Sequence, residues 1–128
     1  MIDADPYELQ VPADPSGLST VRVFLRAVAR SVDATPERTD DLELVVSEIS
    51  AAVVEGGGRW VTVTVRPEPA RLDVDVRGDA APPAPEDNPI RVDLLASLAP
   101  DTSWADHGAR FSLSLDMPDA GEAAARAR

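Results

Sequence analysis

The chain has 128 residues, of which 44% are hydrophobic and only 4% aromatic, so a single domain with an aliphatic core is expected. Its net charge is −11, from 12 basic against 23 acidic residues, and this balance opposes binding to nucleic-acid phosphates. Cysteine and lysine are absent and His107 is the only histidine, which excludes disulfides, zinc–thiolate sites, Schiff-base chemistry and a multi-histidine metal centre.

The first half of the chain carries one strand pattern and two helix patterns. Alternation over residues 7–11 predicts a short strand. Apolar side chains at helical spacing predict a helix over residues 18–32 and a second over residues 37–55. Thr35 is the expected N-cap of the second helix, and the glycines at 56–58 are expected to end it.

The second half is dominated by strands. Strict alternation over residues 60–65 and 71–76 predicts an antiparallel hairpin with one buried face. A proline-rich loop, a short helix and two more strands are predicted over residues 78–89, 90–98, 102–104 and 110–117. We therefore expect an α+β two-layer sandwich, with a mixed, mainly antiparallel sheet of four or five strands and about three helices on one face.

The ends of the chain give expectations about boundaries and location. Residues 1–118 are expected to form the single domain, and the run of Ala, Arg and Glu over residues 119–128 a disordered tail. No stretch reaches the roughly 18 apolar residues that a membrane span needs, and residues 1–5 are acidic where a signal peptide would be basic. A soluble cytoplasmic protein, without membrane or nucleic-acid partners, is expected.

Residues 41–55, Asp-Leu-Glu-Leu-Val-Val-Ser-Glu-Ile-Ser-Ala-Ala-Val-Val-Glu, carry a recognisable pattern. They resemble the N-box helix of the RsbW-type anti-sigma serine kinases, in the histidine-kinase/Hsp90-like ATPase superfamily. The resemblance runs in order over about residues 7–117, through the Leu-Gln-Val-Pro-Ala-Asp-Pro segment near the start, the hairpin, and the Leu-Leu-Ala-Ser-Leu-Ala-Pro-Asp segment that begins at Leu94. It implies the histidine-kinase-like ATPase fold, in agreement with the layers predicted above.

The N-box of this chain departs from the family at one position. The family's glutamate, which helps to activate the attacking hydroxyl, matches Glu48. Four residues later the family uses an asparagine that holds Mg²⁺ against the phosphates, and this chain has Ala52. A methyl group cannot ligate a hard cation, which needs oxygen donors.

The two glycine motifs of the family are altered as well. The D-x-G-x-G motif corresponds to the stretch from Gly78, in which Asp79 is one position off and Ala80 and Pro82 replace the glycines. The G-x-G-L motif, which cradles the triphosphate, corresponds to residues 89–92, which contain no glycine. The resemblance with these changes implies a degenerate nucleotide site, so that no cofactor and no metal are expected, and Glu48 is a relic of the catalytic site.

The function that survives in such a pseudokinase is binding. The resemblance implies an anti-sigma-like regulator of transcription, in a stress-response type of switch, that sequesters a sigma factor until an anti-anti-sigma partner competes. The family also admits a homodimer. Partner contacts are implied at the first helix, where Arg22, Arg26 and Arg30 share one face. A chain of charge −11 would also be steered toward basic sigma factors.

Two other functions stay open at this point. An active ATP-dependent serine/threonine kinase that phosphorylates an anti-anti-sigma factor would need ATP and Mg²⁺ in a rewritten site, such as Glu48 with Asp79 or Asp87. An orphan structural module would need neither. The plain interpretations of the remaining residues are solvated charges for the arginines, a turn for His107, and core packing for Trp60 and Trp104.

Overall fold

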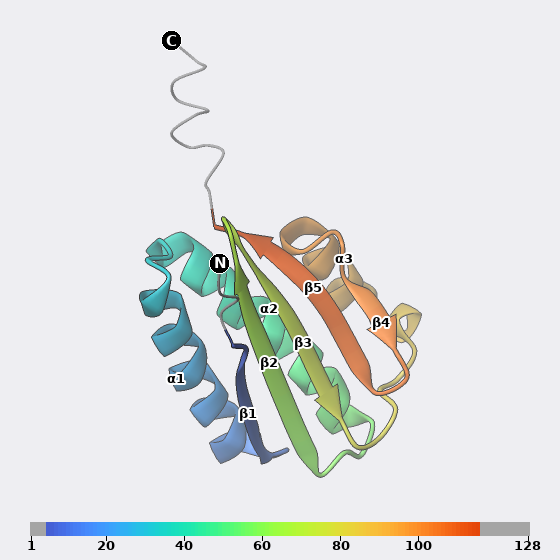
Figure 1. Ribbon diagram of the computed structural model, residues 1–128. Coiled ribbons are helices and arrows are strands. Elements are labelled where there is room, and N and C mark those ends of the chain that lie inside the picture. The colour runs from blue at the N-terminus through green and yellow to red at the C-terminus, as the bar shows by residue number, and fades with distance from the viewer. Residues whose placement is uncertain (1–4, 116–128) are drawn as a thin grey trace.

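The computed structural model describes residues 5–115. Five strands form one sheet in the order β1-β2-β3-β5-β4, and three α-helices cover one of its faces while the other face stays open (Figure 1). The elements are β1 (Tyr7–Pro12), α1 (Pro15–Ser31), α2 (Pro36–Glu55), β2 (Trp60–Glu68), β3 (Arg71–Gly78), a 3-10 turn η1 (Pro85–Asp87), α3 (Pro89–Leu98), β4 (Ser103–Ala105) and β5 (Gly108–Ser114).

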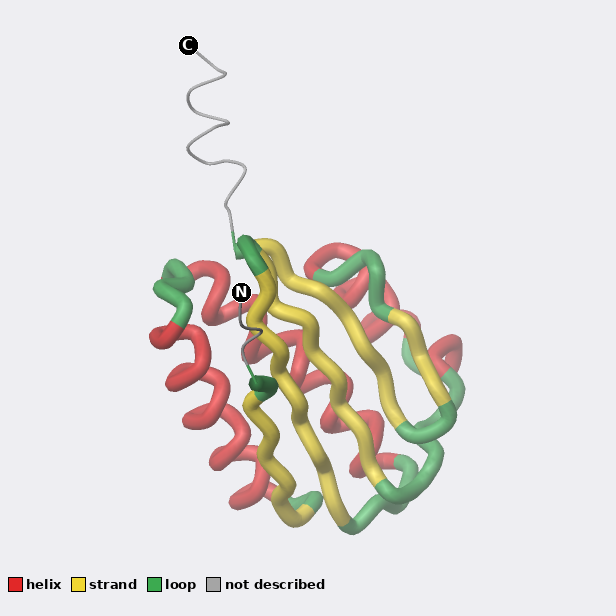
Figure 2. Tube along the Cα trace, viewed as in Figure 1, coloured by secondary structure: helices red, strands yellow, loops and turns green. Residues whose placement is uncertain are grey.

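The expected two-layer α+β fold and its element order are confirmed, with one refinement of the sheet. All four strand pairings in the described chain are antiparallel, whereas a mixed sheet was allowed for. The reason lies in the connection between β1 and β2. Helices α1 and α2 run in opposite directions along the sheet, so the chain returns to the end of the sheet at which β1 ends (Figure 2). Strand β2 therefore starts beside the end of β1 and runs antiparallel to it.

Helix α1 starts three residues earlier than its apolar pattern predicts. Asp14 accepts a hydrogen bond from the amide of Gly17 at 2.8 Å and caps the helix. Pro15 then occupies the first helical position, where its missing N–H costs nothing. A Cβ on Gly17 would lie 1.9 Å from the carbonyl oxygen of Pro12, so only glycine lets the helix turn back so closely on β1.

The predicted ends of α2 are confirmed. The hydroxyl of Thr35 accepts a hydrogen bond from the amide of Arg38 at 3.1 Å. At the other end the helix is capped by Gly56, and Gly57 takes a φ of 89°, a left-handed conformation that favours glycine. These caps fix the register of the helix that carries Glu48.

The core forms between the inner sheet face and the helices, as the alternation and the apolar stripes predict. The inward valines of β2 and the leucine and valines of β3 are buried against the stripe of α2; fully buried examples are Val61, Val63, Val65, Leu72, Val76, Leu42, Val45, Val46, Ile49 and Val53. The hairpin is longer than predicted, because pairing continues to Glu68 opposite Arg71. Strand β5 ends at Ser114, and the predicted positions of Met117 and of the tail 119–128 lie outside the described residues.

No helix in the described chain is both long and apolar enough to cross a membrane.

The two faces of β2 provide a direct test of the layer arrangement. Val63 is fully buried under the helices, whereas its neighbour Thr62 faces the open side. Val63→Asp would bury a charge without a partner, and we expect it to lower the free energy of unfolding by several kcal/mol, on the order of 4. Thr62→Asp should cost less than about 1 kcal/mol. Urea denaturation measures both, and equal losses would contradict a sheet with one open face.

Candidate functional site

The site predicted from the N-box lies on the face of α2 that α3 covers. Glu48, Ala52 and Glu55 are spaced by four and three residues, so they share one face of α2. The side chain of Asn88 accepts a hydrogen bond from the amide of Arg91 at 3.0 Å and caps α3. That cap fixes the first turn of α3 beside α2, with Arg91 on its inner side.

Arg91 binds both carboxylates of this face. Its Nε donates to Glu48 Oε1 at 3.1 Å, while Nη1 and Nη2 donate to the two carboxylate oxygens of Glu55 at 3.2 and 2.8 Å. The Arg91 side chain is only 7% exposed, against 31% for Glu48 and 48% for Glu55. Ala52, which lies between the two acids along the helix, is 1% exposed. A buried guanidinium group therefore spans the face where the family holds its metal.

The protonation behaviour of the cluster follows from this contact. Hydrogen bonding to Glu55 raises the pKa of Arg91, with a smaller contribution from Glu48, against the opposing effect of burial. Conversely, the hydrogen bonds from Arg91 lower the pKa of the Glu55 carboxyl below its usual 4.5. The guanidinium stays charged at any ordinary pH, and Glu55 stays ionised well into the acidic range.

The loop that corresponds to the second motif has structural contacts of its own. The carboxylate of Asp79 accepts hydrogen bonds from the amides of Arg59 and Trp60 at 2.7 and 3.2 Å, and these bonds lower the pKa of Asp79. A Cβ on Gly78 would lie 2.2 Å from a methyl group of Val53, so this glycine is required for packing against α2. Asp79 thus binds the backbone at the start of β2, whereas Glu48 binds Arg91.

These residues do not fit a magnesium–nucleotide group. Magnesium at a nucleotide takes one or two protein oxygen ligands besides the phosphates and water, and the resemblance places one of these ligands at Ala52. Ala52 offers a methyl group, and the neighbouring Glu48 is bound to a cation already. A divalent cation at this face would meet the positive charge of Arg91, which repels it. The rewritten site with Glu48 and Asp79 or Asp87 finds no support in this geometry.

Arg91 is the functional residue that sequence reasoning missed. The stretch 89–92 was noted only for its lack of glycine. The available signal was the spacing of Arg91 to Leu95 and Leu98, which places the arginine on the buried side of α3. An arginine in the apolar stripe of a helix requires a buried carboxylate partner, and the acids of α2 were the candidates.

The arginines of α1 are not equivalent. Arg26 Nε donates to Glu43 at 2.8 Å, and this hydrogen bond raises the pKa of Arg26. Arg22 and Arg30 are exposed, and neither has an ion pair within the described chain. Arg26 and Glu43 thus join α1 to α2, so Arg26 is not simply a solvated charge.

The two tryptophans differ from one another as well. Trp104 packs against the core, as predicted. Trp60 is 44% exposed at the start of β2, so the prediction of core packing is wrong for it. The reason is its parity: residues 61, 63 and 65 point inward, and Trp60 therefore points to the open side. His107 is exposed in the turn before β5, and its backbone carbonyl accepts a hydrogen bond from the amide of Gly78 at 2.8 Å.

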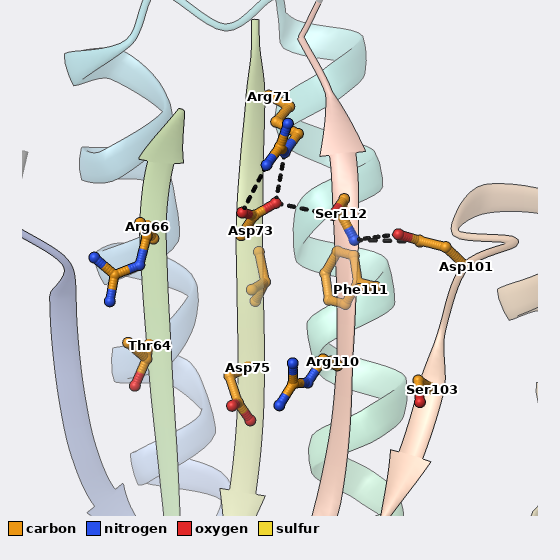
Figure 3. Close-up of a pocket in the computed structure, with 11 residues that line it drawn as sticks. Thr64, Arg66, Arg71, Asp73, Asp75, Asp101, Ser103, Arg110, Phe111 and Ser112 are labelled. Carbon is orange, nitrogen blue, oxygen red and sulfur yellow. Dashed lines mark hydrogen bonds and ion pairs between the residues drawn. The ribbon is translucent and has the colours of Figure 1, made fainter. Parts of the chain in front are cut away.

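The open face of the sheet carries a shallow cavity of about 450 Å³ (Figure 3). Its lining is polar. Arg71 donates two hydrogen bonds to Asp73 at 2.8 and 3.2 Å, and the hydroxyl of Ser112 donates to the same carboxylate at 2.8 Å. The carboxylate of Asp101 accepts from the backbone amide of Ser112 at 3.0 Å. We name the outward-facing side of β2, β3 and β5, with this cavity, the open face.

Comparisons with known proteins agree with the fold. The family model described as the histidine kinase-like ATPase domain matches residues 11–124. A crystal structure titled as the RsbU and RsbW domains of Rv1364c from Mycobacterium tuberculosis is similar, with a TM-score of 0.72 and 16% identity. That match covers 88% of this chain, and this chain spans 33% of the larger protein. No curated protein sequence matches.

Replacing Arg91 tests what the cluster contributes to the fold. Arg91→Met keeps the apolar stem and removes both ion pairs. We expect a loss of about 1–2 kcal/mol in the free energy of unfolding, below the 3–5 typical of a fully buried pair, because the two glutamates are partly hydrated already. Faster amide hydrogen exchange in α3 should accompany it. Arg59→Met, at an 85% exposed arginine, is the control and should change stability by less than about 0.5 kcal/mol.

The lowered pKa of Glu55 makes the cluster sensitive to acid. A carboxylate whose pKa is depressed on folding adds stability above its unfolded pKa, near 4.5, and loses it as the pH falls through the folded pKa. We expect Glu55→Gln to flatten the loss of stability below about pH 4.5 relative to the parent chain. Melting temperatures measured at steps of pH report this, and parallel curves for the two proteins would refute a stabilising contact.

Proposed function

The chain belongs to the histidine kinase-like ATPase domain family, and we propose that it is an RsbW-type regulator that acts by binding a sigma factor and uses no nucleotide. An anti-anti-sigma protein would relieve the binding by competition. The RsbW type is inferred from the similar crystal structure, whose title names an RsbW domain. Because sigma factors act on RNA polymerase, the proposal also places the chain in the cytoplasm.

The observation that carries the proposal is the contact of Arg91 with Glu48 and Glu55. A kinase of this family needs the N-box carboxylate free to activate a hydroxyl, and it needs an oxygen ligand at the position of Ala52. In this chain the carboxylate is held by a buried cation, and the segment that corresponds to the family's G-x-G-L motif is fixed to α2 by the same residue. Such a domain keeps its surface without the catalytic step.

The rival function is an active serine/threonine kinase with ATP and Mg²⁺. It would require Arg91 to leave Glu48 and a metal to bind next to a methyl group. Each step costs free energy, since the buried guanidinium loses its hydrogen bond to Glu48 and the metal gains no ligand from Ala52. We therefore favour the binding function over the kinase.

The partner surface that we propose is the outer face of α1. Arg22 and Arg30 form no ion pair with any residue from 5 to 115, and the neighbouring Val23 is 63% exposed. Unpaired arginines fix the register of a partner by binding its carboxylates, while the overall charge of −11 attracts a basic protein over longer distance. An exposed valine beside them offers apolar area at the centre of the contact.

Pairwise pull-downs with purified sigma factors from the source genome test the function. We expect one of them to be retained without nucleotide. Arg22→Glu/Arg30→Glu should weaken its retention at least tenfold, with the melting temperature nearly unchanged, because surface charges act on association more than on folding.

Two controls make the pull-down decisive. Arg66→Glu/Arg110→Glu changes the net charge equally on the opposite face of the domain and should leave retention intact. Glu48→Ala should do the same, since this carboxylate has no catalytic task in our proposal. Retention that requires ATP–Mg²⁺, or that is lost in Glu48→Ala but kept in the α1 variant, would restore the kinase.

A further inference from the structure

The open face holds two arginines that the fold does not use. In the register of the sheet, Arg66 on β2 lies opposite Asp73 on β3, and Arg110 on β5 lies opposite Asp75. Both pairs of opposite charges would normally join across the strands. Asp73 is bound instead by Arg71 from its own strand.

Arg110 and Asp75, the second cross-strand pair, are also not joined, because Asp75 is bound by an arginine of its own strand. Arg77, two residues along β3, donates to Asp75 at 2.9 Å. As a result, neither Arg66 nor Arg110 forms an ion pair within residues 5–115, and both are exposed. They are two cations without a direct carboxylate contact in that range, on a protein of charge −11, and Arg66 acts on Asp73 only at longer range, where its charge helps to lower the pKa of that carboxyl.

The two arginines are too far apart to hold one small anion well. Two strand spacings of about 4.8 Å and a two-residue offset of about 6.7 Å separate their Cα atoms by roughly 12 Å. Figure 3 shows the two guanidinium groups extending from β2 and β5 with β3 and its carboxylates between them, and they do not converge. A phosphate in the cavity would also face Asp73 and Asp75. The arrangement suits two separate carboxylates on a larger ligand.

Trp60 provides an apolar anchor on the same side. It shares the strand parity of Arg66, six residues away, which is roughly 20 Å along β2. Exposed tryptophan and arginine are the residue types that contribute most to protein–protein contacts. In a chain with only two tryptophans, a half-exposed one on a charged sheet face is the clearest apolar feature of that face.

The dimensions of the open face match a modest protein contact. The three strands of this face span about 10 Å and the eight residues of β3 about 26 Å, a projected area of roughly 250 Å². A standard interface buries about 800 Å² on each partner. The open face is therefore smaller than one side of a standard interface, and it suits a short segment of a partner.

We propose that the open face is a second docking surface, which binds an acidic protein segment with two carboxylates for Arg66 and Arg110 and an apolar side chain for Trp60. The charge of the domain makes this selective. An acidic segment is repelled from most of a surface with net charge −11, and it is attracted only where unpaired arginines gather. The surface lies across the sheet from α1 and α2, so it does not depend on the function proposed for the α1 face.

Amide chemical shifts of the ¹⁵N-labelled full chain test this surface. The probe is a synthetic peptide of repeated Glu-Leu-Glu units, and the same peptide with Lys in place of Glu is the charge control. We expect the Glu peptide to shift amides of β2, β3 and β5 and the indole N–H of Trp60, with saturation as the peptide is titrated.

The variants discriminate between the two faces. Arg66→Gln/Arg110→Gln should weaken binding of the Glu peptide at least tenfold with an unchanged melting temperature, since neither arginine has an internal partner. Arg22→Gln/Arg30→Gln, with the same change of charge on α1, removes any binding of the peptide to the helix and should leave the peptide-induced shifts of the open-face amides unchanged. No shifts on the open face, equal binding by the Arg66/Arg110 variant, or a face already covered by a second copy in sedimentation experiments would overturn the proposal.

Discussion

The guanidinium group of Arg91 is the contact on which the rest of the site depends. It joins two helices that share little other surface, and it satisfies two carboxylates that would otherwise repel each other across two turns of α2. A buried arginine is stable only when its charge is paired and its N–H groups are bonded, and here Glu48 and Glu55 supply both. The same contact holds α3 beside α2 and, in the function that we propose, keeps the N-box carboxylate from taking part in catalysis.

The cap of α3 and the loop before it serve the same arrangement. Asn88, the only asparagine of the chain, caps α3, and Asp79 caps the start of β2. The family resemblance implies that in an ATPase of this fold an asparagine binds the metal and an aspartate binds the adenine base. In this chain Asn88 and Asp79 instead form hydrogen bonds with backbone amides at the start of α3 and of β2.

The periodic part of the molecule was predictable, and the reasons are physical. Helices with apolar stripes and strands with strict alternation bury one face each, so α2, β2 and β3 follow from side-chain order alone. For the candidate site, the sequence showed which residue stands at each family position, such as Ala52, but not which side chains contact one another. Arg91 was not found, because its role depends on a contact across 36 to 43 residues that no local pattern encodes. The prediction of core packing for Trp60 was wrong for a different reason: it rested on the size of the side chain, whereas exposure follows from strand parity.

Binding of ATP–Mg²⁺ by titration calorimetry tests the central claim most directly, with the parent chain and Arg91→Met compared under the same conditions. If Arg91 and Ala52 have replaced the metal site, the parent chain should give no saturable heat at millimolar nucleotide, with or without Mg²⁺. Arg91→Met should give none either, since removal of the cation restores no oxygen ligand. A saturable signal from the parent chain with a Kd below about 1 mM, more than roughly 4 kcal/mol of binding, that a chelator abolishes would contradict the account.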